Sequence, residues 1–135
     1  MDQTAITYPW TTVTDMTGET IKTVLEDVCD NLFNPDPYYQ QGGDMVRTGG
    51  MTYTCNPTDK AGSRISYMRF SGQLMDASKT YKVAGWAPVQ EASKNAGPPA
   101  WEVVETYLKD KKTIEPIKLY NPKLLGLEGN PGVVL

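Results

Sequence analysis

Two stretches of the chain place apolar residues at helical spacing. In the first, after Thr17, the apolar residues are Ile21, Val24, Leu25, Val28, Leu32 and Phe33. Residues three and four apart share one face of a helix, so this spacing predicts an amphipathic helix that buries that face. Thr17 suits the N-cap, and Asn34-Pro35 predicts where the helix ends. A second helix is predicted over residues 100–111, with Trp101 and Tyr107 in the core.

Strands are predicted between these helices. Residues 4–16 read as extended and are interrupted by Pro9, and further strands are predicted at 51–55, 63–70 and 80–86. The turn-forming residues 56–62 predict that the strands on either side of them pair antiparallel. Three tyrosines on these strands are expected to be half-buried, namely Tyr53, Tyr67 and Tyr81.

The order of elements predicts an α+β fold with a mixed, largely antiparallel sheet packed with helices. With 135 residues, the chain is expected to form a single domain over residues 1–135. Residues 113–135 contain three prolines among isolated aliphatic residues. This segment is predicted to be an extended tail that docks through Ile117, Leu119, Leu124 and Leu125.

Composition and charge narrow the class of partner. The chain is 39% hydrophobic and 21% charged, which is ordinary for a globular protein, and its net charge is −3. No basic stripe is present, so we expect neither nucleic acid nor an anionic membrane as a partner. No apolar run approaches the roughly 20 residues that a membrane-spanning helix needs.

Residues able to carry catalysis or bind a metal are scarce. The chain has no histidine, which excludes Ser-His-Asp and Cys-His catalysis and the commonest ligand of zinc and manganese sites. Glu26, Asp27 and Asp30 lie largely off the apolar stripe of the first helix, so we expect them to be solvated. Cys29 and Cys55 permit one disulfide without requiring it, and are interpreted as two buried free thiols.

Residues 34–50 form the most unusual segment of the chain. Their sequence is Asn-Pro-Asp-Pro-Tyr-Tyr-Gln-Gln-Gly-Gly-Asp-Met-Val-Arg-Thr-Gly-Gly. Proline restricts φ, and glycine permits positive φ and the close approach of a ligand. Aromatic side chains and an arginine held among such residues are typical of a shaped binding loop.

Several segments, taken in this order, resemble the C-terminal domain of the 5′-nucleotidase family. They are Tyr8-Pro9-Trp10, Met16-Thr17-Gly18-Glu19, the glycine-rich residues 42–50, Gly62-Ser63-Arg64-Ile65 and Thr80-Tyr81-Lys82-Val83-Ala84. Within that family the chain is similar to the sulfur-oxidation thiosulfohydrolases, the SoxB branch. The segments that carry this similarity are Leu25-Glu26-Asp27-Val28, Phe33 to Arg47, Gly85-Trp86-Ala87 and Glu128-Gly129-Asn130-Pro131-Gly132.

The sequence also departs from the nucleotidase pattern. Where nucleotidases have Pro-Phe-x-Asn, this chain has Pro9-Trp10-Thr11-Thr12. The aromatic residue that follows the first glycine pair in nucleotidases, and stacks on the base, is replaced here by Asp44 or Met45. The second aromatic position aligns with Trp86. A nucleotide is therefore not the expected substrate.

The resemblance implies a substrate-binding C-terminal domain from a larger two-domain enzyme of the periplasm. In that branch a separate N-terminal metallophosphoesterase-like domain holds two manganese ions. The enzyme releases sulfate from a cysteine S-sulfonate on the carrier protein SoxYZ. This chain would then contain no cofactor and would be inactive alone.

Arg47 is the residue expected to contribute to catalysis, because a guanidinium can meet two oxygens of a sulfonate and stabilise developing charge. The alternative is a structural arginine that pairs with Asp44 or with loop carbonyls. Tyr38 and Tyr39 are predicted to line a channel for the carrier's peptide arm, unless one of them anchors the loop. Substrate contacts are also predicted for Asp44, Met45 and Trp86, although Trp86 also fits a core or interdomain position.

Two other functions stay open. One is a nucleoside-binding domain of a 5′-nucleotidase, and the other is a stand-alone binding module with no enzyme attached.

Overall fold

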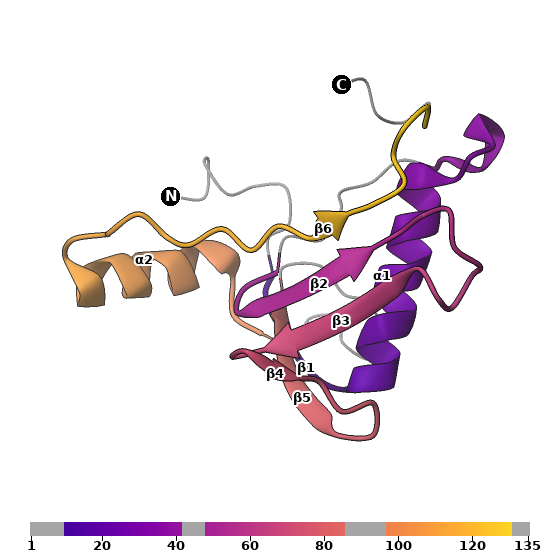
Figure 1. Cartoon of the computed structure of the whole chain (residues 1–135). Helices are drawn as coiled ribbons and strands as arrows, with labels where there is room; N and C mark the ends of the chain where they lie inside the picture. Colours follow the sequence, from indigo (N-terminus) through magenta and orange to yellow (C-terminus); the bar gives the residue numbers. More distant parts are fainter. Residues whose placement is uncertain (1–9, 42–47, 86–96, 131–135) are drawn as a thin grey trace. The chain divides into compact units, whose positions relative to one another are not determined.

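The computed structural model describes residues 10–41, 48–85 and 97–130, and Figure 1 shows their path. The chain divides into two compact units. Unit 1 comprises residues 1–16 and 80–117, and unit 2 comprises residues 17–79 and 118–135. Each unit therefore combines segments that are far apart in the sequence.

Helix α1 (Gly18–Phe33) begins and ends where the sequence predicts. The side chain of Thr17 is the N-cap, and its Oγ1 accepts a hydrogen bond from the backbone N–H of Thr20 at 3.1 Å. Gly18 is required by a close approach, because a Cβ at this position would overlap the carbonyl of Asp76. The C-cap is Asn34, whose extended backbone leads into Pro35.

The sheet of unit 2 has the strand order β4-β3-β2-β6. Its strands are β2 (Met51–Cys55), β3 (Ile65–Phe70), β4 (Gln73–Leu74) and β6 (Lys123–Leu124). β2 pairs antiparallel with β3, β3 pairs antiparallel with β4, and β6 lies parallel to β2. The mixed, largely antiparallel sheet predicted from the sequence is thus confirmed. The two-residue strands β4 and β6 were not predicted, since neither carries an alternating pattern.

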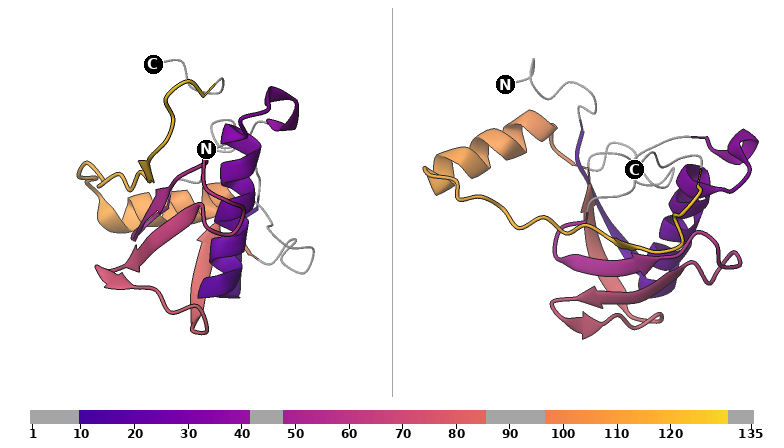
Figure 2. Two further views of the ribbon diagram at one scale, coloured as in Figure 1. Left: turned by 45° about the vertical axis from the view of Figure 1, so that its right-hand side comes forward. Right: turned by 45° about the horizontal axis from the view of Figure 1, so that its top comes forward.

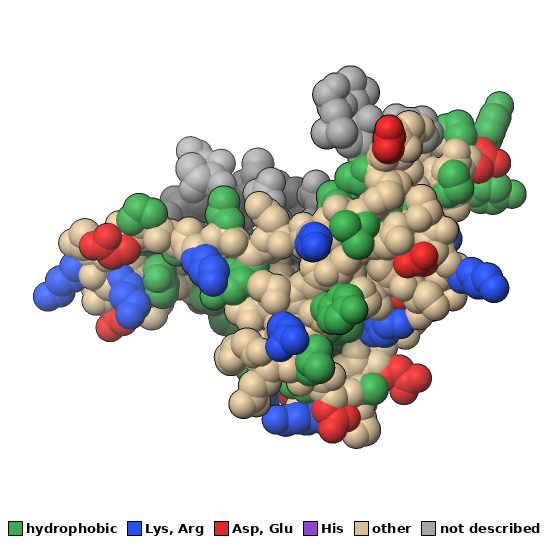
Figure 3. Space-filling view, viewed as in Figure 1, with side chains coloured by type: hydrophobic (Ala, Val, Ile, Leu, Met, Phe, Trp, Pro, Cys, Tyr) green, Lys and Arg blue, Asp and Glu red, His purple; other side chains and the backbone are tan. Residues whose placement is uncertain are grey.

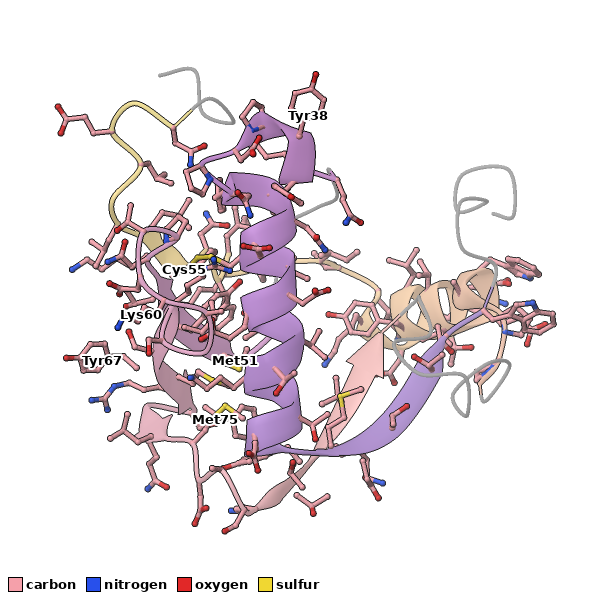
Figure 4. The ribbon with its side chains drawn as sticks, turned by 90° about the vertical axis from the view of Figure 1, so that its right-hand side faces the viewer. Tyr38, Met51, Cys55, Lys60, Tyr67 and Met75 are labelled. Carbon is pink, nitrogen blue, oxygen red and sulfur yellow. A yellow bond between two sulfur atoms is a disulfide. The ribbon has the colours of Figure 1, made fainter. Side chains whose placement is uncertain are left out.

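The core of unit 2 lies between α1 and one face of this sheet, as the two views in Figure 2 show. Its buried residues are Leu25, Cys29 and Phe33 from α1, Met51, Tyr53 and Cys55 from β2, and Ile65 from β3. Figure 4 shows Met51 and Met75 on the side of the sheet that faces the helix.

Cys29 and Cys55 form a disulfide within this core, and both are fully buried. The prediction of two free thiols was therefore wrong. Burial alone made the two residues look like small hydrophobic side chains, and the sequence did not reveal that α1 places Cys29 directly against β2.

A β-bulge interrupts the pairing of β2 with β3. The register shifts between Thr52 and Thr54, and opposite this point Tyr67 has a positive φ of 51°. The bulge turns Tyr67 outward, away from α1 in Figure 4, and leaves it 71% exposed, whereas Tyr53 is only 3% exposed. The prediction that both are half-buried was wrong, while Tyr81 does have intermediate exposure.

In unit 1, β1 (Thr12–Thr17, its last residue assigned to unit 2) and β5 (Thr80–Gly85) form a two-stranded sheet. Helix α2 (Ala100–Lys111) begins next to it, where the backbone N–H of Thr11 donates to the carbonyl of Pro98 at 3.0 Å. No residue of α2 is buried, and Tyr107 is 48% exposed. The prediction of Tyr107 and Trp101 as core residues was therefore wrong, because Tyr107 is exposed and Trp101 is only partly covered.

Two leucines attach the segment from Lys118 to Asn130 to the core of unit 2. Leu124 and Leu127 pack against that core, and the N–H of Leu125 donates to the carbonyl of Cys55 at 2.9 Å. Ile117 and Leu119 were also predicted to dock, but they are 74% and 69% exposed. Among the described residues, neither α1 nor α2 has the length and apolar content that crossing a membrane requires.

Candidate functional site

A short turn after α1 carries the two aromatic residues of the predicted site that the structure describes. This turn is the 3-10 helix η2 (Pro37–Tyr39), and we call residues 34–40 the tyrosine turn. Tyr38 is 96% exposed and Tyr39 is 63% exposed. Tyr38 points away from α1 in Figure 4, so neither tyrosine anchors the loop by packing beneath it.

Hydrogen bonds define the shape of this turn. Oδ1 of Asn34 accepts from the N–H of Asp36 at 2.9 Å, and Oδ1 of Asp36 accepts from the N–H of Tyr38 at 2.9 Å. The side-chain amide of Gln40 returns to donate to the carbonyl of Asn34 at 2.7 Å. The turn is therefore closed on itself, with its polar groups inside and its two phenol rings outside.

Glu26 attaches the turn before β3 to α1 and is not simply a solvated acid. Its carboxylate, with a side chain only 11% exposed, accepts from the backbone N–H groups of Gly62, Arg64 and Ile65 at 3.0, 3.2 and 2.8 Å. The expectation of solvation was wrong for this residue. A carboxylate that satisfies three backbone donors holds the start of β3 against the helix.

Asp30 also makes a specific contact. Its carboxylate lies 2.5 Å from the guanidinium of Arg64, and its Oδ1 accepts from the side-chain amide of Asn34 at 3.1 Å. The sequence signal for Asn34 was its position at the helix end before a proline. No local signal in the sequence indicated that Arg64 contacts Asp30 and, through it, Asn34.

Four of the predicted site residues lie outside the described residues, namely Arg47, Asp44, Met45 and Trp86. Only the two ends of the glycine-rich loop are described. After the gap, Thr48 Oγ1 donates to the carbonyl of Met51 at 2.7 Å, and Gly50 adopts a φ of 80°, where a Cβ would lie 3.3 Å from the ring of Phe70. Both ends of the loop thus start from unit 2. The roles of Arg47, Asp44, Met45 and Trp86 stay predictions.

Two hollows among the described residues are lined by side chains outside the predicted site. In unit 1, a cavity of about 550 Å³ is lined by Pro98, Glu102, Val103, Thr106, Tyr107 and Asp110. In unit 2, a cavity of about 330 Å³ is lined by Gly18, Glu19, Lys22, Met68, Met75 and Ala77, none of which belongs to the predicted site. Figure 3 shows acidic and basic side chains interspersed on the face in view, with apolar side chains at the tip beyond α1. Over the described ranges, no three His, Cys, Asp or Glu residues cluster as a metal site would require.

Comparison with models of protein families identifies the family of the chain. The family model described as "5′-nucleotidase, C-terminal domain" matches residues 8–96. The chain belongs to this family. The match covers β1, α1 and the strands to β5, whereas α2 and β6 follow it in the sequence. Comparison with curated proteins found no match.

Solved structures with the same fold include that of a sulfate thiohydrolase. The chain is 32% identical to the sulfate thiohydrolase SoxB of Thermus thermophilus, solved in complex with glycerol, with a TM-score of 0.76 over 89% of this chain and 23% of that one. The resemblance to SoxB noted in the sequence is thus confirmed.

Two further structures share the fold of this 5′-nucleotidase C-terminal domain at lower identity. A putative 5′-nucleotidase from Staphylococcus aureus, in complex with alpha-ketoglutarate, is 16% identical with a TM-score of 0.59, over 87% of this chain and 27% of that one. A 5′-nucleotidase precursor from Thermus thermophilus is 21% identical with the same TM-score, over 87% and 25%. The chain therefore spans about a quarter of the length of these structures.

Proposed function

We propose that this 5′-nucleotidase C-terminal domain is the substrate-binding domain of a periplasmic thiosulfohydrolase. The enzyme would release sulfate from a cysteine S-sulfonate carried by a protein such as SoxYZ. The observation that carries the proposal is the 32% identity and TM-score of 0.76 to SoxB over 89% of the chain. The nucleotidase structures, at 16% and 21% identity, support the fold alone.

The donor set of the chain supports a division of labour. A dimetal centre needs several His or carboxylate ligands, but the sequence has no histidine and the described residues contain no such cluster. The described residues do not fit a metal site. We therefore assign the two manganese ions of the proposed enzyme to a separate metallophosphoesterase-like domain and the substrate contacts to this chain.

The disulfide supports the proposed compartment. Cys29 and Cys55 are joined and fully buried, and structural disulfides form and persist in oxidising environments such as the bacterial periplasm. A cytosolic location would leave these two thiols reduced in the core of unit 2.

The decisive residue of the proposal is Arg47, whose guanidinium would hold sulfonate oxygens as charge develops on them. In a protein that joins this chain to the metal-binding domain, Arg47→Ala should lower kcat for sulfate release by about 100-fold, the usual cost of one oxyanion donor. Arg47→Lys keeps the charge but loses the fork, so it should recover only part of the rate. Sulfate release from a cysteine S-sulfonate peptide measures both.

Arg69→Ala is the matched control, because Arg69 is an exposed arginine of unit 2 that donates to the carbonyl of Gly72 at 3.0 Å. It should leave turnover unchanged. An unchanged rate in Arg47→Ala would reduce Arg47 to a structural residue. Hydrolysis of adenosine monophosphate in preference to the S-sulfonate would overturn the proposed substrate. If the reading frame contains no upstream Asp-x-His and Asn-His-Glu patterns, the proposal that this chain is part of a metal-dependent enzyme would be refuted.

A further inference from the structure

The tyrosine turn is shaped by its own hydrogen bonds and is also held at its base by residues outside it. We propose that a relay of polar contacts, running from Arg64 through Asp30 and Asn34 to Asp36, preorganises Tyr38 and Tyr39 for contact with the substrate-bearing partner. Asn34 is the central positioning residue of this relay. The inference rests on the proposed function for the role of the tyrosines, but not for the geometry of the turn.

The first half of the relay fixes the end of α1. The backbone of Arg64 is held by Glu26 at 3.2 Å, and its Nε donates to the carbonyl of Asp59 at 3.2 Å, so the guanidinium has a defined position. That guanidinium meets Asp30 at 2.5 Å, with the Arg64 side chain only 15% exposed. Asp30 is therefore oriented by a residue 34 positions later in the sequence.

The second half of the relay transfers that orientation to the tyrosines. Asp30 accepts from the side-chain amide of Asn34 at 3.1 Å, which fixes the rotamer of Asn34 and aims its Oδ1 at the N–H of Asp36. The carboxylate of Asp36 then accepts from the N–H of Tyr38. Asp30, Asn34 and Asp36 thus each accept a hydrogen bond from the next side chain or the next segment of backbone, while Arg64 donates to Asp30.

A second contact holds the same place from the far end of the chain. The side-chain amide of Asn130 donates to the carbonyl of Phe33, the last residue of α1, at 2.8 Å. Residues near 64 and near 130 therefore both fix the base of a turn whose own aromatic rings are exposed. The turn is held by polar contacts and not by burial of its tyrosines.

This arrangement has a physical consequence for binding. An exposed tyrosine on a loose loop loses conformational entropy when a partner immobilises it, which weakens binding. Here the backbone of Tyr38 is already ordered by Asp36 and Asn34, so the partner has mainly the side chain to immobilise. Tyrosine also supplies a large amphipathic contact with few rotatable bonds, as interface anchors usually do.

Amide hydrogen exchange in the 135-residue chain tests the geometry directly. Asn34→Ala removes both the acceptor for Asp36 and the donor to Asp30, so exchange at the Asp36 and Tyr38 amides should become roughly 10- to 30-fold faster, as expected for two lost hydrogen bonds. Asn31→Ala is the matched control, because Asn31 makes the same kind of contact to Asp27, at 3.3 Å, one turn earlier on α1. It should leave both rates unchanged.

Variants at Asp36 separate the relay from a general loss of structure. Asp36→Asn keeps Oδ1 as an acceptor and should keep the Tyr38 amide protected from exchange. Asp36→Ala should make exchange at the Tyr38 amide about fivefold faster. Slow exchange in β2 shows that each variant is folded. If Asn34→Ala leaves exchange at Tyr38 as slow as in the wild type, the positioning inference is overturned, whatever the tyrosines do in catalysis.

Kinetics in the two-domain protein test the role of the tyrosines separately. Tyr38→Ala and Asn34→Ala should both raise KM for a carrier-borne S-sulfonate several-fold with little change in kcat. Faster exchange in Asn34→Ala together with an unchanged KM in Tyr38→Ala would leave the relay intact and refute the proposed contact.

Discussion

The disulfide between Cys29 and Cys55 should contribute a large part of the stability of unit 2. The two residues are 26 positions apart in the sequence, and cross-linking them removes the entropy of closing that loop from the unfolded chain. For this loop length the chain-entropy relation gives about 3.5 kcal/mol at 25 °C. A double substitution, Cys29→Ala with Cys55→Ala, should therefore lower the free energy of unfolding by about 3 to 4 kcal/mol.

Urea unfolding at pH 7, with and without a thiol reductant, measures this contribution. Unit 2 contains no tryptophan, so circular dichroism at 222 nm, to which α1 contributes more residues than α2, is the appropriate signal. In the wild type, reduction should lower the free energy of unfolding by a similar amount. In the double variant the reductant should have no effect, which separates the disulfide from any general effect of the reagent.

Titration of thiols in the unfolded protein decides whether the bond is present. The unreduced wild type should show no free thiol, and the reduced protein should show two. If the oxidised wild type and the double variant unfold at the same urea concentration with the same slope, the disulfide adds nothing to stability. The reasoning from loop entropy would then be refuted. Two free thiols in the unreduced wild type would remove the support that the bond lends to an oxidising compartment.

Two further predictions concern buried polar groups of unit 2. Glu26→Ala should lower the free energy of unfolding by about 2 to 3 kcal/mol in urea unfolding, because three backbone N–H groups lose a charged acceptor. Glu105→Ala should leave the free energy of unfolding nearly unchanged, because Glu105 lies on α2 in solvent and pairs there with Lys109. Equal losses in the two variants would contradict the anchoring role of Glu26. Burial raises the pKa of Tyr53 to about 12 from 10.0. The stability contributed by its neutral phenol is complete below pH 10 and is lost as the pH rises toward 12, so stability measured from pH 9 to 12 should fall less steeply in Tyr53→Phe.

Local patterns predicted the elements whose burial follows from their own spacing. The apolar stripe of α1, its cap at Thr17 and its end at Asn34 all depend on residues within a few positions of one another. The same holds for the pairing of β2 with β3, which a short turn connects. Such features form wherever one face of a helix or strand has to leave water, so periodicity is sufficient to find them.

The errors occurred where a distant segment decides the environment of a residue. Tyr67 was predicted to be half-buried on its strand, but the bulge between β2 and β3 leaves it 71% exposed. The stripe on α2 indicated burial of Tyr107, yet an apolar stripe is buried only when another element covers it. Cys29 and Cys55 were recognised as buried, but their bond depends on how α1 lies on β2.

The tyrosine turn combines both cases, and this determines how far its function can be read from sequence. Its composition predicted a shaped loop because proline, glycine and Asx residues restrict the backbone locally. Its final geometry depends on Arg64 and Asn130, which lie 26 and 92 residues beyond Tyr38 in the chain. A substitution at either of these residues would alter the presentation of Tyr38 while leaving the loop sequence intact. The residues that set the geometry of this turn therefore include some that no inspection of the loop itself would select.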